Sequence, residues 1–267
     1  MTPPNFMTLS PPAVVLTDLD ASLLNHDDYR FDAAIPTIER LKTLGIPLVL
    51  ASSKTAVEME AIAAEIGTEA PMICENGGGV HFPDGRVEFL GVRRGEILDI
   101  LDGLRSRFAF RSFEDMGVDG IAKATGLDLE RAGRALRRVA SEPMLIDNPD
   151  DVEPMARALE NFGLTLIRGG RFFHVAGPTD KGRAGRLVVR HYRDSPAKNG
   201  GSAFPVIAVG DSPNDREMLA MADYAILVPG PNGPKMTLDH ANLTIAPQPG
   251  AAGWAAAVND VLMTLND

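Results

Sequence analysis

The 267-residue sequence contains a single cysteine, Cys74, so no disulfide can form within one chain. One cysteine agrees with a reducing compartment, and we expect a cytoplasmic protein. The longest apolar runs stop well short of the roughly 20 residues that a membrane helix needs. The N-terminal segment has no basic stretch followed by an apolar one, so no secretory signal is expected. We therefore expect no membrane association.

Basic residues are also scarce, since 26 Lys and Arg stand against 36 Asp and Glu and give a formal net charge of −10. A protein that binds nucleic acid without sequence preference gains its affinity mainly from Lys and Arg on phosphates, so this class is disfavoured. The overall field repels anions, and any anion site must be built locally. We expect a small-molecule partner and no nucleic acid; the sequence carries no signal for an oligomeric state.

Apolar strands and amphipathic helices alternate through the first 80 residues. The patterns predict buried strands at 14–17, 46–50 and 71–74, with helices at 33–43 and 55–66. This order predicts an α/β fold, a parallel sheet with right-handed crossovers.

The rhythm changes after residue 80, where strands and helices become segregated. We predict a hairpin at 81–89, helices at 96–108 and 128–140, and strands at 143–146, 164–168 and 172–175. The α/β pattern then returns, with a helix at 181–191, a surface loop at 194–203, a strand at 206–209 and a helix at 215–221. The sequence thus predicts a catalytic core of residues 1–80 and 176–267, with an α+β domain of residues 81–175 inserted into it.

Two aspartates, Asp18 and Asp20, directly follow the first predicted strand. Ligands of open α/β sheets bind at the carboxyl ends of the strands. Two carboxylates about 4 Å apart repel by about 4 kcal/mol at an effective dielectric of about 20, unless a cation or a proton offsets the charge. In the functional interpretation, Asp18 is a nucleophile and Asp20 exchanges a proton with the leaving group and with water. The alternative is that both only cap a turn.

Polar residues also follow the second predicted strand and precede a later helix. Ser52, followed by Ser53 and Lys54, could hold a phosphoryl oxygen at a helix start, or could simply cap that helix. Lys181 could neutralise a phosphoryl group, or could be a solvated surface lysine.

The segment Gly210–Asp215 (GDSPND) follows another strand and offers oxygen ligands of the kind that magnesium prefers. Asp211 would be a direct ligand, with Asn214 and Asp215 in support. The alternative is an ordinary Asx turn with an N-cap.

The four segments occur in one order, each with its own predicted element: DLDAS at 18–22, Ser52, Lys181 and GDSPND. Together they resemble the motifs of the haloacid dehalogenase (HAD) superfamily of phosphotransferases. The resemblance implies a Rossmann-like core with a large inserted α+β cap, and Mg²⁺ bound by Asp18, the main-chain carbonyl of Asp20, and Asp211. One position departs from the family pattern Asp-Xaa-Asp-Gly-Thr, because Ala21 stands where glycine would leave the backbone free.

Further stretches resemble the mannosyl-3-phosphoglycerate phosphatases: RGGRFFH at 168–174, SEP at 141–143 and the N-terminal TDLD with LLNHDDY. This resemblance implies hydrolysis to mannosylglycerate, a compatible solute, with the glucosyl analogue accepted by relatives. Arg171 is then expected to hold the substrate carboxylate bidentately, and His174 to contact sugar or glycerate oxygens. The residues expected to line the cleft are Glu75, Asn76 and Gly77. On spacing alone, 169–170 could be a hairpin turn and Arg171 a surface residue.

Two alternatives stay open. One is another enzyme of the same fold, either a broader sugar-phosphate phosphatase or a phosphomannomutase that returns the phosphate to a sugar. The other is a catalytically impaired relative that only binds a sugar phosphate.

Overall fold

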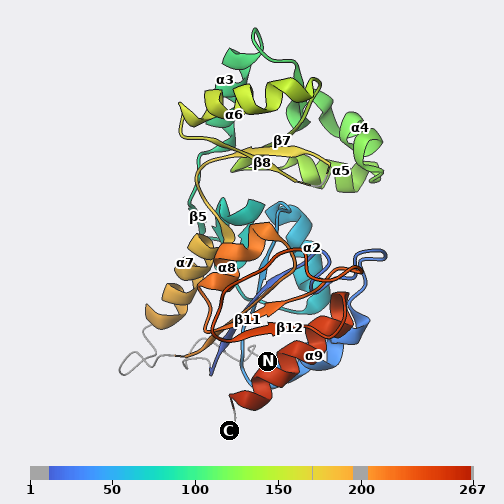
Figure 1. Cartoon of the computed structure of the whole chain (residues 1–267), viewed down its shortest axis with the longest axis vertical. Helices are drawn as coiled ribbons and strands as arrows, with labels where there is room; N and C mark the ends of the chain where they lie inside the picture. The colour runs from blue at the N-terminus through green and yellow to red at the C-terminus, as the bar shows by residue number, and fades with distance from the viewer. Residues whose placement is uncertain (1–11, 170, 195–203, 266–267) are drawn as a thin grey trace. The chain divides into compact units, whose positions relative to one another are not determined.

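A computed structural model describes residues 12–169, 171–194 and 204–265 and separates the chain into two units (Figure 1). The first unit contains Met1–Ser52, Ala63–Ile73 and Asp180–Asp267, and the second contains Ser53–Ile62 and Cys74–Thr179. Most of the predicted loop 194–203 lies outside the described residues. No helix in the described part of the chain is long and apolar enough to cross a membrane.

Short apolar strands form a parallel sheet in the first unit, in the order β12-β11-β10-β1-β2-β3. Every residue of β1, β2 and β10 is buried, which explains why these strands read as continuous apolar runs. The strands are β1 (Val14–Asp18), β2 (Leu48–Ala51), β3 (Met72–Cys74), β10 (Val206–Gly210), β11 (Tyr224–Leu227) and β12 (Leu243–Ile245). The predicted parallel α/β fold is confirmed.

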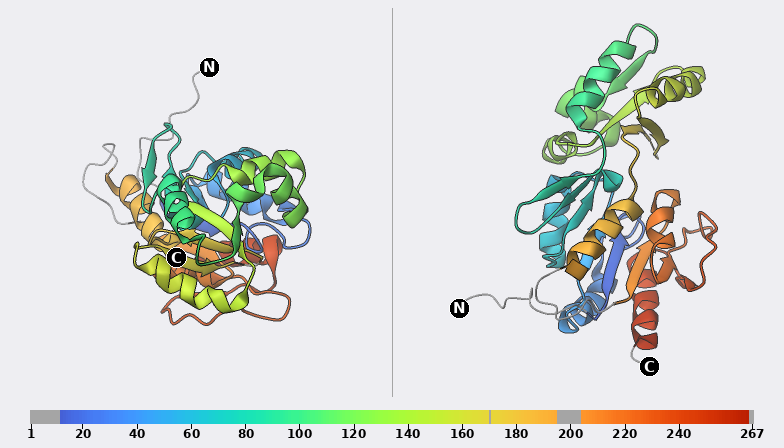
Figure 2. Two further views of the ribbon diagram at one scale, coloured as in Figure 1. Left: turned by 90° about the horizontal axis from the view of Figure 1, so that it is seen from above. Right: turned by 90° about the vertical axis from the view of Figure 1, so that its left-hand side faces the viewer.

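Helices cover both faces of this sheet. The fully buried Trp254 of α9 (Gly250–Thr264, red in Figures 1 and 2) donates its indole N–H to Thr17 Oγ1 at 2.9 Å. Gly185 of α7 (Lys181–Asp194) lies against the side chain of Leu16. Because consecutive side chains of a strand point to opposite faces, α7 and α9 cover opposite faces at β1. The other helical elements here are η1 (Asp32–Ala34), α1 (Ile35–Thr43), α2 (Ala56–Ile66, which spans both units), η4 (Pro213–Asp215) and α8 (Arg216–Ala220).

The second unit contains an antiparallel sheet in the order β6-β7-β9-β8 and a hairpin of β4 and β5. One apolar cluster joins α3 and α6 to the sheet, and another joins α4 to α5. The elements are η2 (Glu75–Gly77), β4 (Gly79–His81), β5 (Val87–Phe89), α3 (Arg94–Leu104), β6 (Phe110–Ser112), α4 (Phe113–Thr125), α5 (Leu129–Leu136), β7 (Ser141–Ile146), η3 (Pro149–Asp151), α6 (Val152–Glu160), β8 (Thr165–Arg168) and β9 (Phe173–Ala176).

The sequence patterns missed six helices and strands: β6, α4, α6, β11, β12 and α9. Helix α4 was hidden because Gly117 interrupts it with a φ of 57°, a left-handed value that breaks the helical repeat. Two predicted helices were too long, since 96–108 corresponds to α3 and 128–140 corresponds to α5. The hairpin predicted at 81–89 is confirmed as β4 and β5.

Candidate active site

The strand register brings three polar residues to the same edge of the parallel sheet. Asp18 pairs with Ala51 of β2, and its predecessor Thr17 pairs with Val209 of β10. Asp18, Ser52 and Asp211 therefore stand at or just beyond the carboxyl ends of three neighbouring strands. This edge is where open α/β sheets bind ligands.

Lys181, the first residue of α7, joins this edge from outside the sheet. Its ammonium Nζ lies 2.5 Å from Asp18 Oδ1 and 2.7 Å from Asp215 Oδ1. Lys181 and Asp215 are fully buried, and Asp18 is 5% exposed. A lysine buried to this degree is stable only when paired, so its position depends on both carboxylates.

Asp215 also organises the turn that carries Asp211. Its Oδ2 accepts the backbone N–H groups of Asp211 at 3.0 Å and Ser212 at 3.1 Å. The buried Asp211 carboxylate pairs in turn with Lys235. The turn at the end of β10 is thus stabilised by hydrogen bonds to the Asp215 side chain and by the ion pair of Asp211 with Lys235.

The three buried carboxylates are suited to a hard divalent cation. Asp18, Asp211 and Asp215 each offer an oxygen, and these oxygens lie within 4.8 Å of one another. Magnesium prefers oxygen ligands and uses few carboxylates. When all three carboxylates are ionised they outnumber the two lysines, Lys181 and Lys235, so a cation would relieve the remaining negative charge. The donor set therefore fits the ion that the sequence motifs imply.

Burial and charge act in opposite directions on the pair Asp18 and Lys181. Burial raises the pKa of Asp18 to about 8, although the Lys181 ammonium pulls it down and Asp215 adds to the rise. Burial alone would lower the pKa of Lys181, but the two carboxylates outweigh it and raise that pKa above its usual range. A bound cation would favour the ionised form of Asp18.

The loop after Asp18 adopts a conformation that glycine usually supplies. Ala21 has a φ of 62°, in the left-handed region. Ser22 is fully buried, and its hydroxyl has no hydrogen-bond partner among the described residues. Asp20 is partly exposed and forms an isolated bridge with Leu24. The loop leaves a buried hydroxyl to which a ligand or water could bond.

A second polar cluster lies within the second unit around Glu75. Its carboxylate accepts the N–H groups of Val139 at 2.7 Å and Ala140 at 3.1 Å, and the Ser141 hydroxyl at 2.6 Å. Glu75 and Asn76 have φ values of 52° and 57°. Such left-handed conformations in non-glycine residues cost free energy and are common at functional sites.

The remaining predicted residues of the second unit have local partners. The carbonyls of Lys54 and Gly77 accept the Glu75 N–H at 3.0 Å and the Thr179 hydroxyl at 2.8 Å. Arg171 is exposed and donates to the Ala124 carbonyl in the last turn of α4, where basic side chains are favourable.

His174 is a largely buried imidazole on β9. Burial, assisted by the charge of Arg138, lowers the pKa of His174 to about 3. Its Nδ1 atom is buried and has no hydrogen-bond partner in the part of the chain that the structure describes. His174 is therefore neutral at physiological pH.

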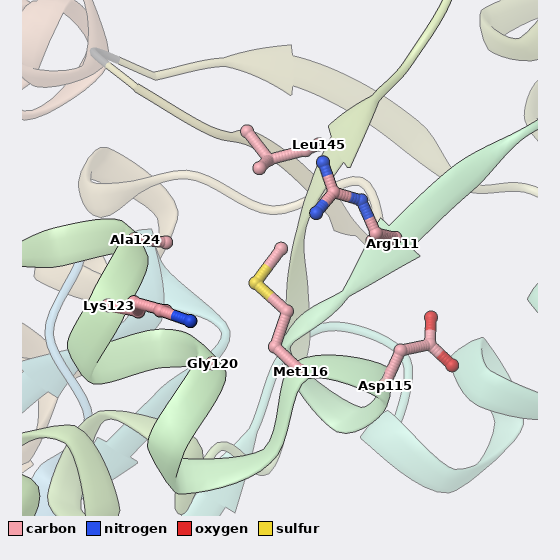
Figure 3. A pocket seen from close by; sticks show the side chains of 7 residues that line it. All are labelled: Arg111, Asp115, Met116, Gly120, Lys123, Ala124 and Leu145. Atoms are coloured by element: carbon pink, nitrogen blue, oxygen red, sulfur yellow. The ribbon is translucent and has the colours of Figure 1, made fainter.

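The second unit also contains a cavity of about 400 Å³ between α4 and the sheet (Figure 3). Arg111 and Leu145 extend into it from the strands, and Met116 and Lys123 from the helix. None of the predicted substrate-binding residues lines this cavity.

Comparison with known proteins identifies the family. A sequence profile described as haloacid dehalogenase-like hydrolase matches residues 15–106. A glucosyl-3-phosphoglycerate/mannosyl-3-phosphoglycerate phosphatase of Persephonella marina is 37% identical over 93% of this chain and 97% of its own length. A phosphatase of the same name from Methanococcoides burtonii is 32% identical over the same shares. The chain belongs to the haloacid dehalogenase-like hydrolases. The expectation of a phosphatase enzyme is confirmed.

Solved structures with the same fold as this hydrolase are also known. A protein of Thermoplasma acidophilum has a TM-score of 0.67 at 19% identity and covers 95% of this chain and 98% of its own. A haloacid dehalogenase-like hydrolase from Bacteroides thetaiotaomicron has a TM-score of 0.65 at 17% identity, covering 93% of this chain and 99% of its own.

Two side chains of this hydrolase's polar clusters escaped sequence reasoning. Arg138, which is 8% exposed, donates to the Ser53 carbonyl at 2.6 Å and to the Ser141 hydroxyl at 2.9 Å, and lies 3.6 Å from Glu75. Lys235 pairs with Asp211. Neither residue stands next to a predicted strand end, and no local pattern marked them.

Asn214 differs from the other predicted residues of its turn because it is exposed. Its side-chain oxygen accepts the Ser212 hydroxyl at 2.6 Å.

Of the residues predicted at the phosphate and metal site, the structure brings together Asp18, Lys181, Asp211 and Asp215.

Proposed function

We propose that this hydrolase removes the phosphate of mannosyl- and glucosyl-3-phosphoglycerate through an aspartyl-phosphate on Asp18, and that it acts in the cytoplasm. The observation that carries the proposal is the buried contact of Lys181 with Asp18 and Asp215, at the sheet edge that also presents Asp211. The names of the two similar phosphatases support the choice of substrate and favour both sugars rather than mannose alone.

The proposed reaction uses the side chains at the carboxyl edge of the parallel sheet. A carboxylate oxygen of Asp18 attacks phosphorus, and the bond from phosphorus to the substrate oxygen breaks. Asp20 donates a proton to that departing oxygen. Asp20 then takes a proton from the water that attacks the aspartyl-phosphate, which releases inorganic phosphate and restores Asp18. Ser52 and Lys181 hold and neutralise the phosphoryl oxygens.

Magnesium is the proposed cofactor. Asp18, Asp211 and Asp215, together with the main-chain carbonyl of Asp20, would hold it. When bound, it would offset the negative charge of the phosphate beside three carboxylates. The positive charge of this cation would reduce the repulsion between the acidic protein and an anionic substrate.

We assign recognition of the rest of the substrate to the inserted domain, residues 81–175, and to polar residues outside it. Arg171 would hold the glycerate carboxylate, and His174 would accept or donate one hydrogen bond as a neutral imidazole. Glu75 would act through Arg138 and the segment 139–141, which its carboxylate already binds. The other proposed contacts are Ser53, Lys54, Asn76, Gly77 and Asn214.

Phosphate release with magnesium tests the proposal. We expect turnover of both glycosyl-3-phosphoglycerates at a higher kcat/KM than a generic aryl phosphate. Asp18→Asn should lower kcat at least about a thousandfold, because the nucleophile is lost. Asp260→Asn, the same change at an exposed site on α9, should leave kcat unchanged.

Two results would overturn the proposal. Full activity in Asp18→Asn would show that Asp18 is not the nucleophile. A protein that hydrolyses no phosphomonoester would show that the chain is not a phosphatase. Transfer of phosphate to a sugar with little free phosphate would instead identify a mutase.

A further inference from the structure

Helix α7, labelled in Figure 1, carries a row of arginines at its surface. Arg183, Arg186, Arg190 and Arg193 are all exposed. Their spacing of three or four residues places them on one face of the helix. They line a groove of about 440 Å³ within the first unit.

Apolar side chains and one acid complete the groove. Val206, at the start of β10, and Met221, just after α8, contribute apolar surface. Asp223 is the acidic residue there, and its Oδ2 already accepts the Val206 N–H at 2.8 Å. The volume falls in the range of small-molecule sites, about 300–1,000 Å³.

Two of these arginines, Arg186 and Arg190, differ from most arginines on the other helices. Elsewhere a helical arginine often pairs with an acid three or four residues away; the pairs are Arg105–Asp102, Arg131–Asp128, Arg134–Glu130 and Arg157–Glu153. In the described part of the chain, Arg186 and Arg190 form no ion pair, and α7 has no acid between Lys181 and Asp194. Like charges at this spacing destabilise a helix by about 0.2–0.5 kcal/mol per pair. Arg186 and Arg190 therefore lower the stability of the helix unless a bound anion neutralises them.

We propose that this groove binds a small polyanion with at least two phosphate groups. A guanidinium matches a phosphate with two parallel hydrogen bonds. Successive arginines lie about 5–6 Å apart at Cβ, so the row extends beyond what a single phosphate can engage. The apolar surface of Val206 and Met221 offers room for an organic group attached to the phosphates.

The groove is separate from the candidate active site but is built on the same elements. Helix α7 begins at Lys181, β10 ends just before Asp211, and α8 begins directly after Asp215. A ligand in the groove would contact α7 from Arg183 onward, the start of β10 and the residue after α8. Binding to the folded state alone would stabilise this unit by mass action.

Isothermal titration of the full-length protein in magnesium buffer tests the proposal, with inorganic tripolyphosphate and ATP as separate probes. The test variant is Arg186→Gln/Arg190→Gln. The control is Arg131→Gln/Arg157→Gln, which removes the same charge from exposed, ion-paired positions in the second unit. Release of phosphate from a phosphomonoester, measured alongside, checks that each variant is folded.

We expect wild type and control to bind one more tripolyphosphate per chain than the test variant, or to bind it at least tenfold more tightly. ATP binding at least tenfold tighter than tripolyphosphate would identify a nucleoside polyphosphate as the ligand, and equal binding would identify the phosphate chain alone. The same stoichiometry and affinity in all three proteins would overturn the proposal. An equal loss in the control would also overturn it, since general attraction to positive charge would then explain the binding.

Discussion

Ala21 bears conformational strain beside the nucleophile position. Its φ of 62° brings Cβ close to the following carbonyl oxygen, a clash that costs an L-residue about 1–2 kcal/mol. Glycine avoids the clash but loses more entropy on folding, which offsets part of the gain. The strain explains why the HAD motif usually has glycine at this position.

Ala21→Gly should therefore raise the free energy of unfolding by about 0.5–1 kcal/mol. Denaturant unfolding measures this change. The control is Ala64→Gly on the exposed side of α2. The same chemical change should there lower the free energy of unfolding by about 1 kcal/mol, because glycine is a poor helix former. Destabilisation by both substitutions would show that Ala21 is unstrained.

His174 should make stability depend on pH. Its folded pKa of about 3 lies below the ordinary value of 6.5. Between these values the unfolded chain binds a proton that the folded protein does not. Stability is then lost as the pH falls from 6.5 towards 3, by at most about 1.4 kcal/mol per pH unit.

Unfolding free energies at pH 6.5 and 5 measure this contribution. We expect a smaller loss in His174→Gln than in wild type, because the variant has no imidazole to protonate on unfolding. His26→Gln removes an exposed histidine and should follow wild type. An unchanged pH dependence in His174→Gln would contradict the assignment.

At the scale of elements, Gly182 lets the start of α7 approach the chain at Glu217. A Cβ on Gly182 would lie 2.2 Å from the Glu217 carbonyl oxygen. No real contact is that short, and backbone atoms cannot move aside as a flexible side chain can. The adjacent Lys181 depends on this close packing to reach Asp18 and Asp215.

Gly182→Ala should thus lower the free energy of unfolding by about 1–3 kcal/mol through overpacking and reduce kcat by displacing Lys181. The matched control is Gly103→Ala in α3, where a Cβ meets nothing within 4 Å. That variant should gain about 0.5–1 kcal/mol. Thermal unfolding and phosphate release measure both effects. Normal kcat in a folded Gly182→Ala would show that Lys181 does not depend on this contact.

At the scale of the whole molecule, the buried acidic trio should link folding to metal binding. Magnesium that binds only the folded state at about 100 times its Kd adds about 2.7 kcal/mol of stability. For a chain of this size, each kcal/mol corresponds to about 2–4 °C in Tm. The wild-type Tm should rise by several degrees with saturating Mg²⁺ and fall again with EDTA.

Asp211→Asn should lose most of this magnesium-dependent shift, because it removes a charged ligand. Asp260→Asn should keep it, since that exposed aspartate lies outside the trio. An equal shift in both variants would place the ion elsewhere. The readout is Tm alone, so it does not depend on activity.

Local patterns were enough to predict four strands of the parallel sheet: β1, β2, β3 and β10. Apolar runs of four or five residues specified the strands, and the polar residue after each one specified a site position. Because parallel strands carry their carboxyl ends to one edge, Asp18 and Asp211 could be expected together although 193 positions separate them in the sequence. The patterns failed for α4, since Gly117 breaks the helical repeat there, and for β12, which is only partly buried.

The sequence by itself determined the strands β1, β2, β3 and β10 and the position of Asp18, Ser52 and Asp211 after three of them, because these follow from short-range periodicity and chain order. The resemblance to a known family, and not periodicity, predicted that Lys181 joins them. Only the tertiary structure decided the pairs of Arg138 with Glu75 and Lys235 with Asp211, the close contact at Gly182, and the lack of ion pairs at Arg186 and Arg190 within the described residues. Such contacts join residues with no fixed spacing along the chain. They depend on how the elements pack, and packing is a property of the folded chain as a whole.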